Sequence, residues 1–381
     1  MRIEQLKLTN FRNYTDLDIT FNNHMNIFIG DNGVGKTNIL ESIYILSLTK
    51  SNRYGVEDNL IKFNELFARI SGLINNNDLV KRQEVVFTKN TKQLYINGKE
   101  IRKSRDYISK FCVIAFTPTD LDIIKGSPNV RRNMMNIDIS QLHNDYVSFL
   151  NEYNSIIKIR NEYLKKMNIN GNTDERYLEI LDENLVSKAA KIYEKRFDFI
   201  NKINSYLPKI FKKLSNLDGL YLSFVNNIHV DEYSEEVIKK KMKAKLKKNM
   251  NVEIMQGMTT VGPHRDDFYF SLNNVDMRQF ASQGQQRLAV ISLKIAEIYL
   301  FKDVLGEYPV LLLDDIFSEI DSKKRNKIIK FLNEDIQSII TTTDINDINE
   351  ILLDNAVIYN VKNNKVTKKG RINNGRGKSN K

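Results

Sequence analysis

The sequence predicts an α/β fold with mixed sheets plus helices, interrupted by an inserted α-helical hairpin domain. Three observations predict this fold. A short apolar run, Met25–Ile29, leads into a glycine-rich loop and then into a helical pattern. A second apolar run, Tyr308–Asp315, ends in two acids near the other end of the chain. Between these runs, residues 129–214 show helical periodicity and almost no strand pattern, as expected for an inserted helical domain.

The elements before the insertion alternate between strand and helix patterns. Apolar residues at every second position predict strands at residues 2–9 and at Asp16–Phe21, and Met25–Ile29 is typical of a buried strand. Thr37–Leu48 has its apolar residues on one helical face. Residues 67–101 return to strand patterns and include Asn97-Gly98, which is typical of a tight hairpin turn. Phe111–Phe116 is one more apolar strand.

The insertion contains two long helical patterns. The first is spaced by four and three residues, as in a heptad seam, and only its arginine is out of character: Leu142, Tyr146, Phe149, Tyr153, Ile156, Arg160 and Tyr163. Gly171–Asp174 interrupts it, and a second pattern runs from Leu178 to Ile210. Two long helices joined by a short polar turn make an antiparallel hairpin, either a subdomain packed on itself or a short coiled-coil arm.

These patterns divide the chain into four parts. We expect the N-terminal half of an α/β head at residues 1–118, the helical insertion at 119–250, the C-terminal half of the head at 251–361 and a basic disordered tail at 362–381. Leu220–Val225 is a further expected strand. The lysine-rich stretch Lys239–Lys248 is either a solvated helix face or loop, or a contact for phosphates.

Composition narrows the class of protein. The chain is 41% apolar and 28% charged, as is ordinary for a globular protein, and its net charge is +11. That charge favours a polyanionic partner such as nucleic acid or an anionic membrane, although a lysine-rich genome would also produce it. The single cysteine, Cys112, excludes an internal disulfide and fits a reducing compartment. No stretch approaches the about 20 apolar residues of a membrane span, and no signal-peptide pattern begins the chain, so we expect a cytoplasmic protein.

The strongest motif is a phosphate-binding loop. Residues 30–37 match G-x-x-x-x-G-K-[ST], follow an apolar strand and begin a helix, as this motif requires. Glycines allow the backbone N–H groups to approach phosphate oxygens, and the helix N-terminus adds a favourable dipole. We expect Lys36 to reach the β- and γ-phosphates of ATP and Thr37 to bind Mg²⁺. The expected nucleotide-binding residues of the loop are Gly30, Asp31, Asn32, Gly33, Val34, Gly35, Lys36 and Thr37.

The second apolar run has the form of a Walker-B strand. Asp314 is expected to hold Mg²⁺, directly or through water, and Asp315 to polarise the water that attacks the γ-phosphate. Such a run is a weak motif by itself, but together with the phosphate loop it is strong. Their long separation in the sequence is too great for a compact GTPase and fits a nucleotide head that an inserted domain interrupts.

A third motif lies between the other two. Ala281–Gln286 leads into an expected helix, Arg287–Phe301, and is similar to the signature L-S-x-G-Q of the ABC superfamily, with Ala281 in the leucine position. Ser282, Gly284 and Gln285 are therefore further candidate nucleotide-binding residues, because a hydroxyl and a free amide at a helix N-terminus can hold a phosphate. Ser282 and Gln285 also have the spacing of a helix-capping box, and both interpretations can hold together.

The ordered motifs resemble those of ABC-type ATPases of the SMC-like branch. Ser318–Asp321 is similar to the D-loop of that superfamily, which lies at its dimer interface. Four further stretches, spread over the chain, resemble the RecF family: Leu6–Tyr14, Phe116–Leu121, Lys125–Arg132 and Gly262–Asp267. The likeness covers roughly residues 1–360, and the chain length also fits that family.

The resemblance implies a function in recombination and replication-gap repair. It implies ATP and Mg²⁺ as cofactors, an ATP-dependent homodimer, binding to gapped DNA or to junctions of single- and double-stranded DNA, and slow ATP hydrolysis. It also implies RecR and RecO as partners in loading RecA, with no membrane. The alternatives are a nucleotide-binding subunit of an ABC-type transporter and a DNA scaffold that does not hydrolyse ATP.

Several positions depart from the pattern or stay open. Thr119 stands where RecF-like sequences often have glutamate. ABC transporters have a switch histidine after Walker B, whereas this chain has Thr341–Thr343, whose hydroxyls could bond the γ-phosphate or water but are poor bases. His264 and Arg265 follow a tight turn, where Arg265 either pairs with Asp266 or Asp267 or lies near nucleotide or DNA. Arg53 either contacts nucleotide or DNA or caps the helix after the phosphate loop.

Overall fold

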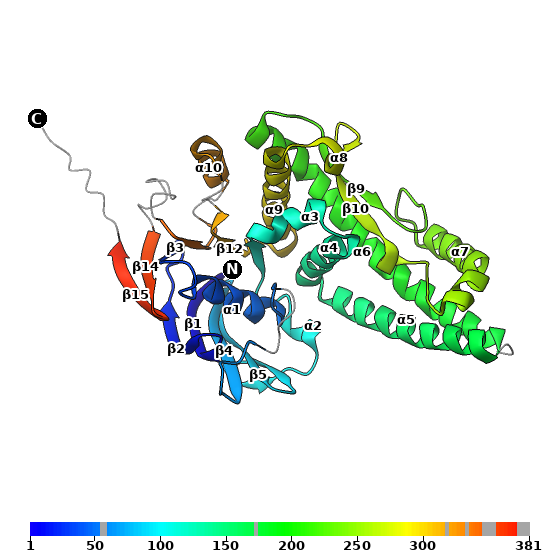
Figure 1. Ribbon diagram of the computed structural model, residues 1–381, viewed down its shortest axis with the longest axis horizontal. Helices are drawn as coiled ribbons and strands as arrows, with labels where there is room; N and C mark the ends of the chain where they lie inside the picture. The colour runs from blue at the N-terminus through cyan, green and yellow to red at the C-terminus, as the bar shows by residue number, and fades with distance from the viewer. Residues whose placement is uncertain (54–58, 171–173, 317–319, 332–334, 345–355, 372–381) are drawn as a thin grey trace, which may run out of the picture. The chain divides into compact units, whose positions relative to one another are not determined.

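A computed structural model gives the fold. It describes residues 1–53, 59–170, 174–316, 320–331, 335–344 and 356–371 (Figure 1). The chain forms two compact units, one made of Met1–Asp120 with Lys294–Lys381 and the other of Leu121–Leu293. The division falls inside helix α9 (Gln283–Leu305). Each unit is described by itself.

The nucleotide-type sheet of the first unit has the strand order β15-β14-β3-β13-β12-β8. Its strands are β3 (Met25–Ile29), β8 (Val113–Phe116), β12 (Val310–Asp314), β13 (Ser338–Thr342), β14 (Ala356–Lys362) and β15 (Lys365–Arg371). All neighbours are parallel except β14 and β15. Parallel strands are covered on both faces, which explains why β3 and β12 are continuous apolar runs in the sequence.

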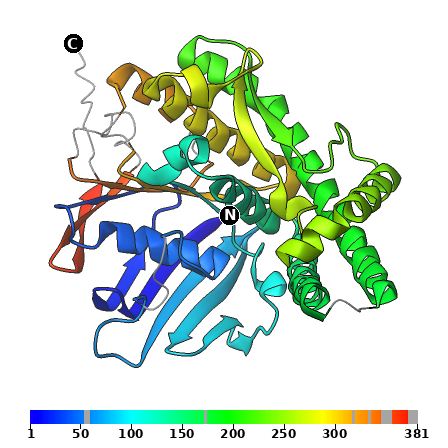
Figure 2. The ribbon, with the colours of Figure 1, turned by 45° about the vertical axis from the view of Figure 1, so that its right-hand side comes forward.

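A second sheet in the same unit is antiparallel, in the order β2-β1-β4-β5-β6-β7. Its strands are β1 (Arg2–Phe11), β2 (Tyr14–Thr20), β4 (Phe67–Asn76), β5 (Leu79–Thr88), β6 (Lys92–Ile96) and β7 (Lys99–Glu100). The expected hairpin at Asn97-Gly98 is confirmed: both residues have positive φ, 50° and 77°, as a type I′ turn requires. Helix α1 (Lys36–Leu48) contacts both sheets and lies between them (Figure 2), so it is almost fully buried.

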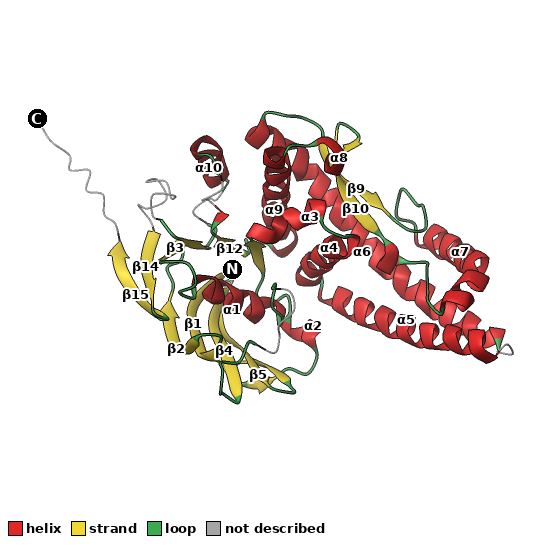
Figure 3. Ribbon diagram, viewed as in Figure 1, coloured by secondary structure: helices red, strands yellow, loops and turns green. Residues whose placement is uncertain are grey.

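The second unit contains the long helices expected from the heptad pattern. They are α5 (Asn144–Asn170) and α6 (Glu175–Ser215), which pack on each other, and α7 (Glu235–Gln256) packs on both (Figure 3). The expected hairpin is therefore confirmed. A third helix, α7, packs against it and carries the lysine-rich stretch. The other elements are α3 (Asp122–Lys125), α4 (Pro128–Leu142), β9 (Leu220–Val225), β10 (Asp267–Leu272), β11 (Val275–Asp276) and α8 (Met277–Phe280).

Arg160, the residue out of character in the heptad seam, holds the three helices together. Its side chain is fully buried and pairs with Asp182 of α6 at 2.5 Å and with Glu253 of α7 at 2.7 Å. It also donates to the hydroxyl of Thr259 at 3.0 Å. A buried charge needs such partners, because an unpaired one costs several kcal/mol. The seam thus carries one ionic contact at a position where a coiled coil would carry an apolar side chain.

The expected disordered tail at 362–381 is wrong over its first part. Residues 365–371 form β15, which pairs with β14 through a two-residue turn at Asn363 and Asn364. Both asparagines have positive φ, 49° and 58°, as a type I′ hairpin requires. The basic composition of residues 362–381 predicts disorder, although the two asparagines favour a turn. No helix in the described ranges is long and apolar enough to cross a membrane.

Candidate nucleotide site

The phosphate loop connects β3 to α1, and its glycines are needed for its shape. Gly33 and Gly35 have φ angles of 80° and 104°, which residues other than glycine rarely adopt. A Cβ on Gly35 would lie 2.7 Å from Asn13 Nδ2, and one on Gly30 would lie 2.3 Å from the carbonyl oxygen of Val361. The loop is therefore packed closely between the β1–β2 turn and β14, and it leaves the N-terminus of α1 for an anion.

Lys36 is the first residue of α1, and its side chain folds back over the loop. Its Nζ donates to the carbonyl oxygens of Gly30 at 2.6 Å and Asp31 at 2.8 Å. Burial lowers the pKa of Lys36, while the carboxylates of Asp315 and Asp314 act in the opposite direction. The ammonium group is thus held at the centre of the loop that the motif predicts as a phosphate cradle.

The topology of the sheet brings Thr37 and Asp314 together. Strand β13 lies between β3 and β12, and all three are parallel, so their carboxyl ends meet at one edge. There the Thr37 hydroxyl donates to Asp314 Oδ1 at 3.0 Å. These residues are 277 positions apart in the sequence. The structure thus joins the two half-sites that the sequence motifs suggested separately.

The residues at this edge fit Mg²⁺ by the chemistry of their donors. Mg²⁺ prefers oxygen ligands and commonly takes one or two protein ligands, with waters and substrate phosphates completing its shell. A threonine hydroxyl and an aspartate oxygen 3.0 Å apart, beside a phosphate loop, supply ligands of this kind. Thr37 and Asp314 are therefore the residues that would hold the ion.

Asp315 has an unusual backbone. Its φ is 49°, in the left-handed region, which is unfavourable for residues other than glycine. Aspartate tolerates this region better than most residues. Its amide donates to the carbonyl oxygen of Thr341 at 3.2 Å. Such strained positions cluster at functional sites. The expected role of Asp315 in polarising water stays a prediction.

The signature residues belong to the second unit. The capping interpretation is confirmed: the Ser282 amide donates to Gln285 Oε1 at 2.9 Å and the Gln285 amide to Ser282 Oγ at 3.3 Å. Gly284 is the second residue of α9 and has no positive φ, and a Cβ built on it would meet no described atom within 4 Å outside its own helix backbone and chain neighbours. Packing against the described residues therefore does not explain a glycine at this position.

The D-loop stretch is only partly visible. Ser318 and Glu319 lie outside the described residues. Asp321 caps helix α10 (Ser322–Ile329) by accepting a hydrogen bond from the Lys324 amide at 2.9 Å. Its expected place at a dimer interface stays a prediction.

His264 and Arg265 make contacts within the second unit. His264 is bonded on both ring nitrogens, to the Tyr153 hydroxyl at 2.7 Å and the Thr259 carbonyl at 3.1 Å, so its place is structural. Of the two interpretations of Arg265, the pairing with Asp266 or Asp267 is wrong, and a place near nucleotide or DNA stays a prediction. Each acid has a different arginine partner, at 2.8 Å for Asp266 and 2.6 Å for Asp267, and Arg265 donates to the Thr259 carbonyl.

Arg53 lies beside the start of α1 rather than at its end. It donates to Asn38 Oδ1 at 3.1 Å and lies 3.6 Å from Glu41. It therefore does not cap the last carbonyls of this helix. A contact with nucleotide or DNA stays a prediction.

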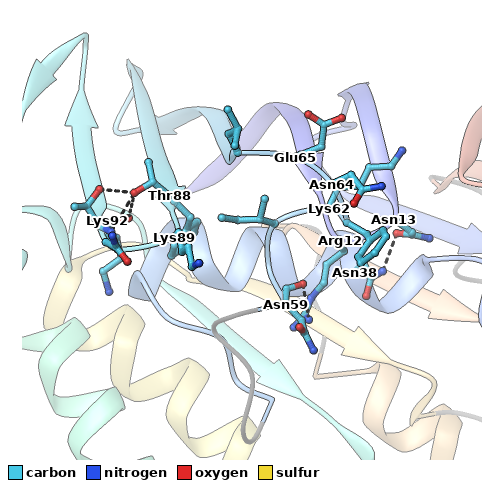
Figure 4. Close-up of a pocket in the computed structure, with 16 residues that line it drawn as sticks. Arg12, Asn13, Asn38, Asn59, Lys62, Asn64, Glu65, Thr88, Lys89 and Lys92 are labelled. Atoms are coloured by element: carbon cyan, nitrogen blue, oxygen red, sulfur yellow. Dashed lines mark hydrogen bonds between the residues drawn. The ribbon is translucent and has the colours of Figure 1, made fainter.

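Sequence reasoning missed the contribution of the β1–β2 turn. The Tyr14 hydroxyl donates to the Gly35 carbonyl at 3.2 Å, and Asn13 Oδ1 accepts a hydrogen bond from Asn38 at 2.8 Å. Asn13 and Asn38, with Arg12, line an open cavity at the side of the loop, and Figure 4 shows the bond between the two asparagines. Arg12, Asn13 and Tyr14 lie within Leu6–Tyr14, whose resemblance to a known family was the one available signal.

The fold and the site define the class of protein: an ABC-type ATPase head of the SMC-like branch. Residues 2–368 match the family model described as the RecF/RecN/SMC N terminal domain. A solved Smc head bound to the C-winged helix domain of ScpA shares the fold, with a TM-score of 0.55 at 15% identity. The second comparison is much closer. A solved structure of the recombination mediator protein RecF-ATP in the RecFOR pathway has a TM-score of 0.90 at 32% identity and covers 97% of each chain.

Curated relatives are similar in sequence to this chain over nearly its whole length. The DNA replication and repair protein RecF of Lactobacillus johnsonii is 37% identical over 365 residues, which is 95% of this chain and 97% of that protein. RecF of Oenococcus oeni is 37% identical over 366 residues, or 95% and 98%. The chain therefore belongs to the RecF family.

Proposed function

We propose that the chain is an ATP-dependent DNA-binding protein of recombinational and replication-gap repair, which dimerises on ATP and resets by slow hydrolysis. The observation that carries this proposal is the joining of Lys36, Thr37 and Asp314 at one edge of a parallel sheet. The similarity to RecF-ATP and to DNA replication and repair proteins supports the choice of nucleotide and of process. Supporting RecA loading at gaps, with RecR and RecO as partners, is the wider role that the resemblance implies.

The placement of the motifs in two different units supports dimerisation. One unit holds the phosphate loop and Asp314, and the other holds the signature. In the ABC superfamily the signature binds the γ-phosphate of the opposite subunit. The free space at Gly284 supports this arrangement, because a glycine that packing does not require is explained by close approach of a phosphate to its amide.

A polyanionic partner is supported by the surface of α7. Three of its lysines are exposed and make no hydrogen bond or ion pair with the described residues, and we call them the α7 lysine face: Lys240, Lys247 and Lys248. Lys247 lies about two turns from Lys240 on nearly the same side of the helix, and Lys248 lies about 100° around the helix from Lys247, so the three lysines cover one broad face. Lysines in this arrangement can contact the phosphates of DNA without reading its sequence.

Hydrolysis assigns separate tasks to the side chains of the site. Bound ATP and Mg²⁺ supply the reactive γ-phosphoryl group and much of the charge neutralisation. Lys36 adds a positive charge at the β- and γ-phosphates, Thr37 and Asp314 orient the ion, and Asp315 polarises the attacking water. Without a switch histidine we expect slow turnover, and a steady-state kcat well above about 10 s⁻¹ would contradict this expectation.

A pair of substitutions tests the proposal. We expect Lys36→Arg to bind ATP weakly or unproductively, and Asp315→Asn to bind ATP without hydrolysing it and to accumulate as a dimer on DNA. Light scattering with ATP, ADP or no nucleotide, with and without gapped DNA, measures dimerisation and DNA binding of both variants, and nucleotide-binding and hydrolysis assays measure the rest. If neither substitution changes dimerisation or DNA affinity, the ATP-gated mechanism is wrong. Co-purification with a membrane protein would instead favour a transporter subunit.

A further inference from the structure

Thr341 contacts both acids that follow the Walker-B strand. It lies on β13, and its side chain is almost completely buried. Its hydroxyl donates to Asp314 Oδ1 at 2.6 Å and accepts a hydrogen bond from the Asp315 amide at 3.3 Å. A threonine hydroxyl has one donor and two acceptor sites, so it can make both bonds at once.

We propose that Thr341 is a positioning residue for the metal-nucleotide site: it aims the Asp314 carboxylate and holds Asp315 in its left-handed backbone. The inference rests on the proposed function, in which Asp314 holds Mg²⁺ and Asp315 polarises water. It assigns to Thr341 a task different from the contact with the γ-phosphate that the sequence had suggested for this threonine cluster.

The direction of the hydroxyl proton supports this assignment. The bond from the Thr341 hydroxyl to Asp314 Oδ1, at 2.6 Å, has the length of charge-assisted hydrogen bonds, which are stronger than bonds between neutral groups. The hydroxyl proton is therefore engaged at Asp314 and is not directed at a nucleotide. Thr343, in contrast, is exposed just beyond the end of β13, where a hydroxyl remains available to a ligand.

The two hydroxyls on Asp314 have different tasks. Thr37 would offer an oxygen lone pair to Mg²⁺, while its O–H remains a donor toward Asp314. Thr341 is not an expected ligand, and its bond can persist. Partners outside the metal's own ligands commonly fix ligand orientation, and their loss reduces metal affinity or activity about 10- to 100-fold.

Asp315 depends on the same residue through its backbone. Its amide is bonded both to the Thr341 hydroxyl and to the Thr341 carbonyl oxygen at 3.2 Å. These bonds fix the amide of a residue whose φ of 49° is otherwise disfavoured. Removing the hydroxyl leaves the carbonyl contact and loosens, rather than abolishes, the arrangement.

The test compares three substitutions on the full chain. Thr341→Val keeps the shape and removes the hydroxyl, and Thr341→Ser keeps the hydroxyl. Thr342→Val is the matched control, because Thr342 is equally buried on the same strand and its hydroxyl donates to the Asp344 carbonyl instead. Mn²⁺ binding is measured by electron paramagnetic resonance with a non-hydrolysable ATP analogue, beside analogue affinity without metal, kcat and KM.

We expect Thr341→Val to weaken Mn²⁺ binding about tenfold and to reduce kcat at least as much, with little change in analogue affinity without metal. Thr341→Ser should restore both within about threefold, and Thr342→Val should match the wild type. If Thr341→Val should fold poorly, as circular dichroism would show, Thr341→Ala replaces it in the same comparison.

Unchanged Mn²⁺ affinity in the hydroxyl-free variant, or an equal loss in Thr342→Val, would overturn the inference while leaving the proposed function intact. Failure of the wild-type protein to bind the metal-nucleotide complex would instead overturn the proposed function, and this inference with it.

Discussion

Replacing Gly284 by alanine should separate the stability of the chain from its assembly. A Cβ at this position meets no described atom within 4 Å outside its own helix and chain neighbours, and the backbone is not in the left-handed region. Exchanging glycine for alanine at such a site stabilises a protein by about 0.4–1 kcal/mol, chiefly by restricting the unfolded chain. The variant should therefore be at least as stable as the wild type.

Assembly should change in the opposite direction. If the γ-phosphate of a second copy approaches the Gly284 amide, an added methyl group occupies the space that the phosphate needs. We expect the ATP-dependent dimer to weaken at least tenfold, which corresponds to about 1.4 kcal/mol. Sedimentation with ATP measures this in an Asp315→Asn background, where the nucleotide should persist.

Gly306, just past the other end of α9, provides the matched control. Its surroundings are equally open, but its φ is +76°, so alanine there is strained and should cost about 1–2 kcal/mol of stability. Gly306→Ala should leave dimerisation unchanged. Undiminished dimerisation of Gly284→Ala would refute the proposed role of the signature in assembly, and a loss of its stability would refute the inference that the site is open.

Three further predictions concern the second unit. Burial lowers the pKa of His264 to about 4, so between pH 6.5 and 4 the unfolded state takes up the proton more readily than the folded state. The contribution of His264 to stability should therefore be complete above pH 6.5 and decline by at most about 3 kcal/mol as the pH falls toward 4, and urea titrations should show this slope vanish in His264→Gln. Arg160→Met should lower the free energy of unfolding by about 3–5 kcal/mol, because it leaves Glu253 buried without its ion-pair partner. Adding Glu253→Gln should recover much of this loss, and a double variant whose loss equals the sum of the two single losses would contradict the explanation. Glutamine at the three positions of the α7 lysine face should weaken DNA binding for every DNA sequence and reduce the slope of log affinity against log salt concentration by roughly one per lysine. Lys243→Gln is the control: the Lys243 ammonium pairs with Glu183, so its loss should change this slope less.

Much of the fold could be predicted because its signals are local. Met25–Ile29 and Leu220–Val225 were expected with the bounds that the structure has, since buried strands and turn residues leave a pattern within a few positions. The Asn97-Gly98 turn follows from backbone sterics alone. Asn363 and Asn364 carry the same kind of signal, but the basic, acid-free composition of the residues around them predicts disorder instead.

The motifs predict the chemistry of the site: a phosphate loop of specific spacing, and an acid pair at the end of a buried strand. Which groups meet depends on the tertiary structure. Thr37 and Thr341 reach one oxygen of Asp314 because β13 lies between β3 and β12. Arg160 is tolerated in an apolar seam because Glu253 arrives from another helix. Such contacts depend on strand order and helix packing, which bring together residues far apart in the chain, and no local pattern encodes them.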